Sequence, residues 1–107
     1  MNIQILAIEG CPSLTAATEY TRAALGELGY DELAIEQITI RDAADARAVA
    51  FAGSPTILAD GADLFPSDGR TEDLACRVYP TESGIAPAPS RAQLVTALRE
   101  RFAHPVH

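Results

Sequence analysis

A nearly continuous apolar run, Ile3–Ile8, is the feature that most constrains the fold of this chain. Gln4 is its only polar residue, and such a run is typical of a strand that is buried on both faces of a sheet. Gly10 ends the run, and we predict that a helix opens directly afterwards at Cys11 and Pro12. Proline suits the first helical position because the N–H that it lacks would have no partner there. A buried strand that leads directly into a helix indicates an α/β fold.

The rest of the sequence continues this alternation of strands and helices. Asp42 can cap a helix that Gly53 closes. Ser90 and Gln93 have the spacing of a capping box at the start of a last helix. In chain order the pattern predicts a first helix up to residue 28, a strand over 35–40, a helix over 43–52, a proline-led strand over 54–59, a polar excursion over 61–73, a strand over 75–79, a loop over 80–90 and a helix over 91–103.

The length and composition fit one domain. The chain has 107 residues, of which 48% are hydrophobic, so we expect a single domain over 1–107 that builds its own core. That core should span about residues 3–103, and the tail, 104–107, should fray. His104 and His107 lie in the tail with no further histidine or cysteine nearby, so no metal site is expected.

The charge balance narrows the range of partners. The net charge is −7 and the sequence has no basic cluster, which argues against binding to nucleic acid or to an anionic membrane surface. The first nine residues have neither the positive region nor the cleavage site of a signal peptide. No apolar run approaches the roughly 20 residues that span a bilayer. We therefore expect a cytoplasmic location, where the two cysteines stay reduced.

Three local features occur in an order that one known fold requires. They are the turn Gly10–Pro12 with its cysteine, the segment Gly53–Thr56 with its proline, and the capped last helix. With them the chain resembles the thioredoxin-like superfamily over about residues 3–103. The resemblance implies a three-layer α/β/α sandwich in the order βαβα(Pro)ββα, around a central mixed four-stranded sheet.

The resemblance also implies site residues. Cys11 takes the place of the reactive thiol, and a helix that starts beside it favours the thiolate form. Pro12, Ser54, Pro55 and Thr56 would hold the partner. In the family the proline corresponding to Pro55 is cis, and the backbone just before it pairs with an extended substrate next to the thiol.

The Cys-x-x-Cys motif of that family is incomplete here, because Leu14 stands at the second cysteine position. Cys11 alone would attack a disulfide or form a mixed disulfide with a small thiol, and a second, external thiol would release it. The expected activity is therefore that of a monothiol disulfide oxidoreductase, with a small thiol or a protein disulfide as partner and no cofactor. An exposed Cys11 can also join two chains under oxidation, so a second copy of the chain is a further partner, in a homodimer.

Cys76 admits two structural interpretations. The ordinary one is a buried core cysteine, at the far end of the strand from Cys11. Four or five residues of strand span about 13–17 Å, whereas the Cα atoms of a disulfide are about 4.4–6.8 Å apart. In the alternative, the excursion over 61–73 changes this path, and Cys76 becomes a second or resolving thiol for Cys11.

Two other functions stay open. The domain would serve as a non-catalytic binding module with Cys11 as a remnant, which Leu14 fits equally well. The stretch Leu74–Tyr79, together with a cysteine at a strand–helix junction, also resembles alkylmercury lyases, which hold mercury between two cysteines. That resemblance implies handling of a soft metal by Cys11 and Cys76.

Overall fold

The apolar run forms the central strand of the sheet. The computed structural model describes residues 2–65 and 74–103. β1 (Ile3–Ile8) pairs in parallel with β2 (Ile35–Ile40) and antiparallel with β3 (Thr56–Ala59), and both partners lie where the sequence predicts strands. A short β4 (Ala62–Asp63) pairs with the other side of β3. The result is a mixed four-stranded sheet in the order β2-β1-β3-β4.

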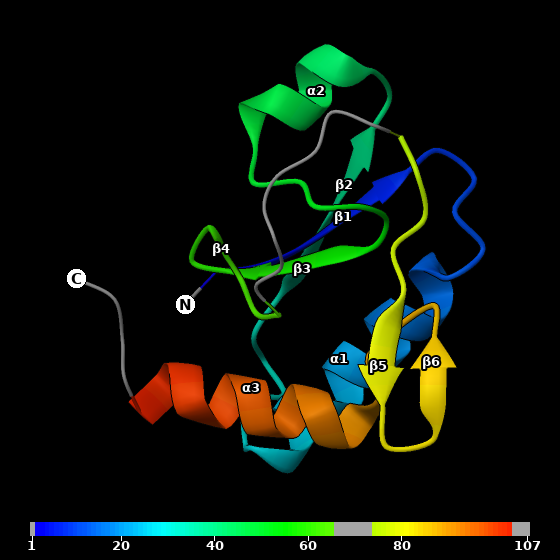
Figure 1. Cartoon of the computed structure of the whole chain (residues 1–107). Helices are drawn as coiled ribbons and strands as arrows, with labels where there is room; N and C mark the ends of the chain where they lie inside the picture. The colour runs from blue at the N-terminus through cyan, green and yellow to red at the C-terminus, as the bar shows by residue number, and fades with distance from the viewer. Residues whose placement is uncertain (1, 66–73, 104–107) are drawn as a thin grey trace.

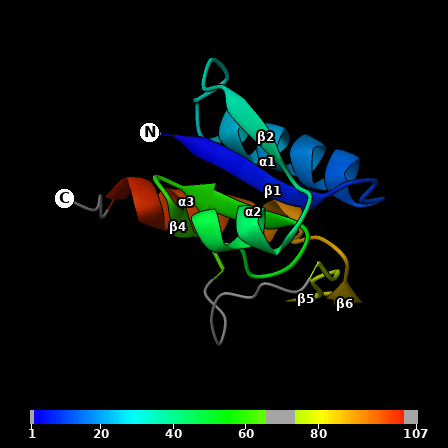
Figure 2. The same cartoon turned by 90° about the horizontal axis from the view of Figure 1, so that it is seen from above.

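Helices cover both faces of this sheet. α1 (Leu14–Glu27) and α3 (Arg91–Ala103) lie together on one face, and α2 (Ala43–Ala48) lies on the other (Figure 1). Viewed from above, α2 lies in front of the sheet and α3 lies behind it (Figure 2). The chain is therefore a mixed α/β structure in which a sheet is enclosed by helices.

Alternate side chains of β1 enter two separate parts of the core. Ile3 and Ile5 pack with Leu25 of α1 and Leu98 of α3, whereas Leu6 packs on the α2 side. All five side chains of these residues are buried. Because both faces of β1 need apolar side chains, the strand reads as a continuous apolar run rather than as an alternating one.

Two helix ends differ from the prediction. α1 begins at Leu14, not at Cys11, and its cap residue Ser13 makes no side-chain hydrogen bond to the helix. α2 has the predicted cap, since a carboxylate oxygen of Asp42 accepts a hydrogen bond from the Asp45 N–H (2.8 Å). It ends at Ala48 instead of Ala52, because the chain straightens there on its way to β3.

The predicted fourth strand over 75–79 is wrong. Asp60 and Gly61 both adopt positive φ (51° and 82°), so the chain turns back at once and Ala62–Asp63 takes the position beside β3. Residues 75–78 contribute one isolated bridge, in which Cys76 pairs in parallel with Ser54, and Tyr79 belongs to a separate small sheet. The turn signal at Asp60 and Gly61 was in the sequence, but the strand after it is too short to show a periodicity.

The predicted loop over 80–90 contains a small hairpin. β5 (Tyr79–Thr81) and β6 (Gly84–Ala86) pair antiparallel and form a separate two-stranded sheet. Three prolines in this stretch concealed the hairpin from sequence reasoning, because proline is rare inside strands. The capping box after it is confirmed, since Ser90 and Gln93 exchange hydrogen bonds of 3.0 and 3.1 Å.

Some expectations fall on segments outside the described residues. These are most of the polar excursion, 66–73, and the tail over 104–107 with His104 and His107. Among the described helices, none combines the length and the apolar character that crossing a membrane requires.

Candidate functional site

Cys11 lies in the loop between β1 and α1, at the end of the sheet toward which β1 and β2 both point (Figure 1). Backbone hydrogen bonds close the loop: the Cys11 N–H donates to the Ile8 carbonyl (3.2 Å), and the Leu14 N–H donates to the Cys11 carbonyl (3.3 Å). Gly10 has a φ of 74°, which glycine adopts at little cost. The thiol is free and half-buried, so a small reagent can reach it.

Ser54 holds the last residue of β1 in place. Backbone pairing between β1 and β3 ends at Leu6 and Thr56. Beyond that point the Ser54 hydroxyl oxygen accepts a hydrogen bond from the Ile8 N–H (3.0 Å). Ser54 is only 1% exposed, and the Ser54–Pro55 peptide bond is cis, as the resemblance implies. The segment before β3 is thus fixed next to the start of the cysteine loop.

Cys76 lies opposite Ser54. The expectation of a buried core cysteine at the far end of the strand from Cys11 is therefore wrong on both points. Cys76 is exposed rather than buried, and its bridge to Ser54 puts it at the same end of the sheet as Cys11 rather than at the far end. The physical reason is that β4 returns immediately after β3. The chain therefore passes the start of β3 a second time, now in the parallel direction.

The backbone of Ser54 is fully engaged by the same chain. Its N–H donates to the Ala75 carbonyl (2.9 Å), and its carbonyl accepts from the Arg77 N–H (2.7 Å). The resemblance implied that this backbone would pair with an extended substrate. In this chain the segment around Cys76 already occupies that place.

A cluster around Arg77 fastens this segment to the sheet. The Arg77 guanidinium donates to the Asp63 carboxylate of β4 (2.7 Å) and to the Phe65 carbonyl, and its carbon lies 4.6 Å from the centre of the Tyr79 ring. The Tyr79 hydroxyl donates to the Pro55 carbonyl. Burial raises the pKa of Tyr79 well above its ordinary value; the nearby Arg77 charge opposes this shift and the Asp63 charge adds to it.

Sequence reasoning missed this cluster, although one signal for it was available. Arg77 and Tyr79 alternate with Cys76 and Val78, and alternation in an extended segment places the two pairs on opposite sides. The apolar Val78 is 62% exposed, whereas Tyr79 is 3% exposed. Without knowledge of β4, nothing in the sequence indicated which side would face the protein.

The other predicted binding residues are placed differently from one another. Pro12 is exposed in the cysteine loop, whereas Ser54, Pro55 and Thr56 are buried. The Thr56 hydroxyl serves internal contacts, since it accepts from the Ala52 N–H (3.1 Å) and donates to a backbone carbonyl. Of the four residues, Pro12 alone presents its side chain to solvent.

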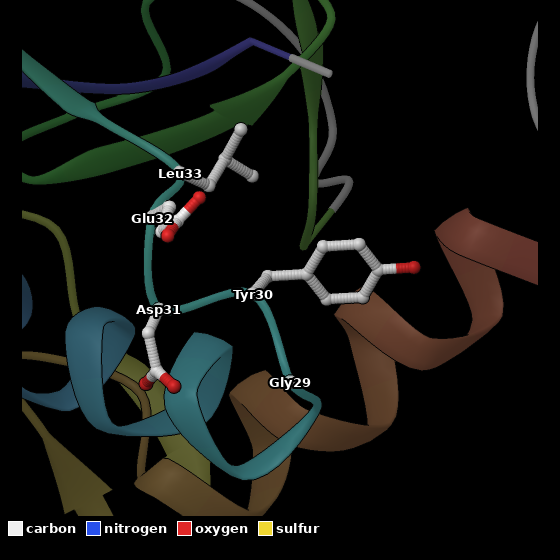
Figure 3. Close-up of a pocket in the computed structure, with 5 residues that line it drawn as sticks. All are labelled: Gly29, Tyr30, Asp31, Glu32 and Leu33. Carbon is white, nitrogen blue, oxygen red and sulfur yellow. The ribbon is translucent and has the colours of Figure 1, made fainter.

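The opposite end of the sheet carries a surface hollow formed by the loop that leads into β2 (Figure 3). Tyr30 points from this loop toward α3, where its ring stacks on Phe102 at 4.2 Å between centres. The Arg22 guanidinium donates to the carbonyls of Asp31 and Leu33, so the loop is fixed by packing and backbone contacts. The hollow has no cysteine in its lining, which consists of Gly29, Tyr30, Asp31, Glu32 and Leu33.

Metal-binding groups do not gather in the part of the chain that the structure describes. Across residues 2–65 and 74–103, no three side chains of histidine, cysteine, aspartate or glutamate lie close enough together to hold a metal ion. The strongest chemical feature is therefore the pair of free thiols, Cys11 and Cys76, that Ser54 brings to one end of the sheet.

Comparisons of the chain with protein-family models, with curated proteins and with solved structures found no match.

Proposed function

We propose that this domain is a thioredoxin-like thiol protein that carries out thiol–disulfide exchange through Cys11. The observation that carries the proposal is the assembly around Ser54. Its hydroxyl holds Ile8 at the base of the cysteine loop, and its backbone holds the segment around Cys76. Two free thiols at one end of the sheet suit sulfur chemistry better than any other reaction class that the described side chains suggest.

The arrangement of elements supports the thioredoxin-like assignment. A parallel β1-α1-β2 unit is followed by α2, by the antiparallel strands β3 and β4, and by α3. This order is similar to the βαβα(Pro)ββα arrangement that the resemblance implies, with the β5–β6 hairpin as an addition before α3, and the similarity supports the proposal. Cys11 follows the first strand and Pro55 precedes the third, which are the places that the resemblance implies.

The chemistry proposed for Cys11 needs only a disulfide and a thiol. The Cys11 thiolate attacks one sulfur of a small disulfide, the S–S bond breaks, and the second sulfur leaves as a thiolate. A further thiol then attacks the mixed disulfide and regenerates Cys11. The half-buried position of Cys11 favours a small disulfide over a bulky one at this step.

The test is the rate at which Cys11 reacts with oxidised glutathione in a Cys76→Ser variant, in which Cys11 is the sole thiol. The folded variant should react about tenfold faster, or more, than the same variant unfolded in urea, because a structured site orients the attack on the disulfide. Mass spectrometry of the glutathione adduct gives both rates. Equal rates would leave a non-catalytic binding module as the better interpretation.

A second candidate is the handling of a soft metal by the two thiols. The placement of Cys76 at the same end of the sheet as Cys11 favours it, because two thiolates suit a soft ion such as mercury. The candidate predicts one mercury(II) ion per folded chain, bound between Cys11 and Cys76. In Cys76→Ser that ion should be lost readily to a competing small thiol, and equal retention by both proteins would rule the candidate out.

A further inference from the structure

The segment Leu74–Val78 has one side that packs against the protein and one that faces solvent. Arg77 faces the protein, where its side chain is 9% exposed and pairs with Asp63. Cys76 is exposed, as are Leu74 (41%) and Val78 (62%) on either side of it. The inward contacts fix the position of the segment, so the thiol of Cys76 is presented from a fixed support rather than from a free loop.

The place that the segment occupies lies beside the cysteine loop. Cys76 pairs with Ser54, and Ser54 in turn holds Ile8, whose carbonyl accepts from the Cys11 N–H. The bridge is made by the neighbours of Cys76, because the Ser54 backbone bonds to Ala75 and Arg77, and the other two steps are direct hydrogen bonds. The backbone near each cysteine is therefore connected to Ser54, on one side through Ile8 and on the other through the bridge to Cys76.

We propose that Cys76 is the internal resolving thiol of Cys11, so that the two form a reversible disulfide within one chain. This inference rests on the proposed function of Cys11. It replaces the external thiol that a Cys-x-x-Leu sequence requires with one that is carried 65 residues further on. The chain's own segment thereby serves as the partner that lies along the Ser54 backbone.

The cysteine loop supplies the movement that this reaction needs. Ser54 lies between Ile8, at the base of the cysteine loop, and Cys76, so these two backbones are two strand spacings apart, about 10 Å. Cys11 has to come closer to Cys76 than that, because the Cα atoms of a disulfide are about 4.4–6.8 Å apart. Ser13 caps α1 without a side-chain hydrogen bond, and Gly10 allows the backbone before Cys11 to rotate. The Arg77 anchor keeps the other partner in place, so Cys11 is the thiol that moves.

The reaction balances with a small disulfide as the oxidant. Cys11 attacks the disulfide, forms a mixed disulfide and releases one small thiolate. The Cys76 thiolate then attacks the Cys11 sulfur, the bond to the small thiol breaks, and a second small thiolate leaves. Cys11 and Cys76 together lose two electrons and two protons, and the small disulfide gains them as two thiols.

The experiment treats dilute, reduced protein with oxidised glutathione and follows the products by mass spectrometry and non-reducing peptide mapping. The intact chain should lose two hydrogen atoms and yield a peptide pair linked through Cys11 and Cys76, at a rate independent of protein concentration. Cys76→Ser should instead accumulate a stable glutathione adduct on Cys11.

A matched variant tests the position of the second thiol. Cys76→Ser combined with Val78→Cys keeps an exposed thiol on the same side of the segment, but moves it away from the residue opposite Ser54. It should resolve the adduct on Cys11 about tenfold more slowly, or worse, because resolution depends on the local concentration of the second thiol. Circular dichroism of each variant checks that the fold is retained.

Three results would overturn the inference. A glutathione adduct on Cys11 that is equally stable in the intact chain and in Cys76→Ser would remove Cys76 from the reaction while leaving the exchange activity of Cys11 intact. A disulfide that joins two chains, with a rate that rises with protein concentration, would replace the internal pair with a dimer. A Cys11 that is inert in every variant would refute this inference and the proposed function together.

Discussion

The two ends of the β1–β3 pair are closed by the same kind of bond and used in different ways. At one end the Ser54 hydroxyl accepts the Ile8 N–H (3.0 Å), and at the other an Asp60 carboxylate oxygen accepts the Asn2 N–H (2.8 Å). Ser54 is buried, whereas Asp60 and Asn2 are exposed. The Ser54 end also holds a second segment of chain, the one around Cys76.

The difference shows how one end of a small sheet becomes a site. Near Asp60 the chain turns directly into β4. The loop over 29–33 (Figure 3) is fixed by the packing of Tyr30 on Phe102 and by hydrogen bonds from Arg22. At the Ser54 end three segments converge, and two of them carry a thiol. Buried polar groups that hold several segments together are costly to remove, so the Ser54 end should respond more strongly to substitution.

The largest effect is expected where the Cys76 segment is anchored. Arg77→Leu leaves the Asp63 carboxylate, 14% exposed, without its cation, and we expect the free energy of unfolding in urea to fall by about 3 kcal/mol. The control is Arg91→Leu, which breaks an exposed pair with Glu27 (3.7 Å) and should cost less than about 1 kcal/mol. Equal losses would show that the Arg77 pair does not anchor the segment.

The next largest loss of stability is expected from a glycine substitution, and two glycines at opposite ends of the sheet can be compared. Gly53 has a φ of 108°, and an added Cβ would lie 2.8 Å from the Arg77 Cβ, whereas Gly29 (φ 87°) has open space around the same position. Gly29→Ala should cost about 1 kcal/mol of stability, from the backbone alone. Gly53→Ala should cost about 2 kcal/mol, because the clash adds to it. Urea unfolding measures both, and a smaller loss for Gly53 would contradict the close packing of the Cys76 segment.

A third comparison removes the closing bonds themselves. Ser54→Ala leaves the Ile8 N–H without its acceptor beside a buried segment, and we expect a loss of about 1.5 kcal/mol. Asp60→Gly removes the corresponding acceptor at the exposed end and tolerates the positive φ of that position, so its cost should stay near about 0.5 kcal/mol. Thermal unfolding of the two variants provides the measurement. Similar losses would mean that burial does not distinguish the two ends.

The smallest effect depends on pH. Because burial raises the pKa of Tyr79 in the folded state, the folded protein holds that proton more tightly than the unfolded chain, whose tyrosine titrates near about 10. The contribution of this group to the free energy of unfolding is therefore fully present below that pH. It falls as the pH rises above it, by about 1 kcal/mol at pH 10.5. Urea unfolding at pH 9 and 10.5 measures the loss. Tyr79→Phe should reduce it, and an unchanged loss in that variant would assign the effect to another group.

The fold could be predicted where side chains repeat with a clear period. The buried strand at Ile3–Ile8, the strand at Ile35–Ile40 and the capped helix after Ser90 are all long enough for a pattern to emerge. β4 has two residues and β5 and β6 have three each. Strands of that length are set by turns and by the neighbours they meet, which a sequence pattern does not report.

The site could be predicted only in part for the same reason. Cys11 was identifiable because it stands between two predicted elements that are adjacent in the chain. Cys76 was misplaced because its position depends on β4, which took the place expected for residues 75–79. Once β4 returns directly after β3, the later segment has to pass Ser54 instead.

The order of β1 and its partners along the chain also matters for biosynthesis. β1 precedes both of its partners, and β3 is completed only at Ala59. At roughly 5–20 residues per second a ribosome needs several seconds to add that stretch. During this time an uncharged, isoleucine-rich strand waits without a sheet around it, which is the kind of segment that aggregates when exposed. The strand at the centre of the finished sheet is thus one that needs protection while the chain is being made.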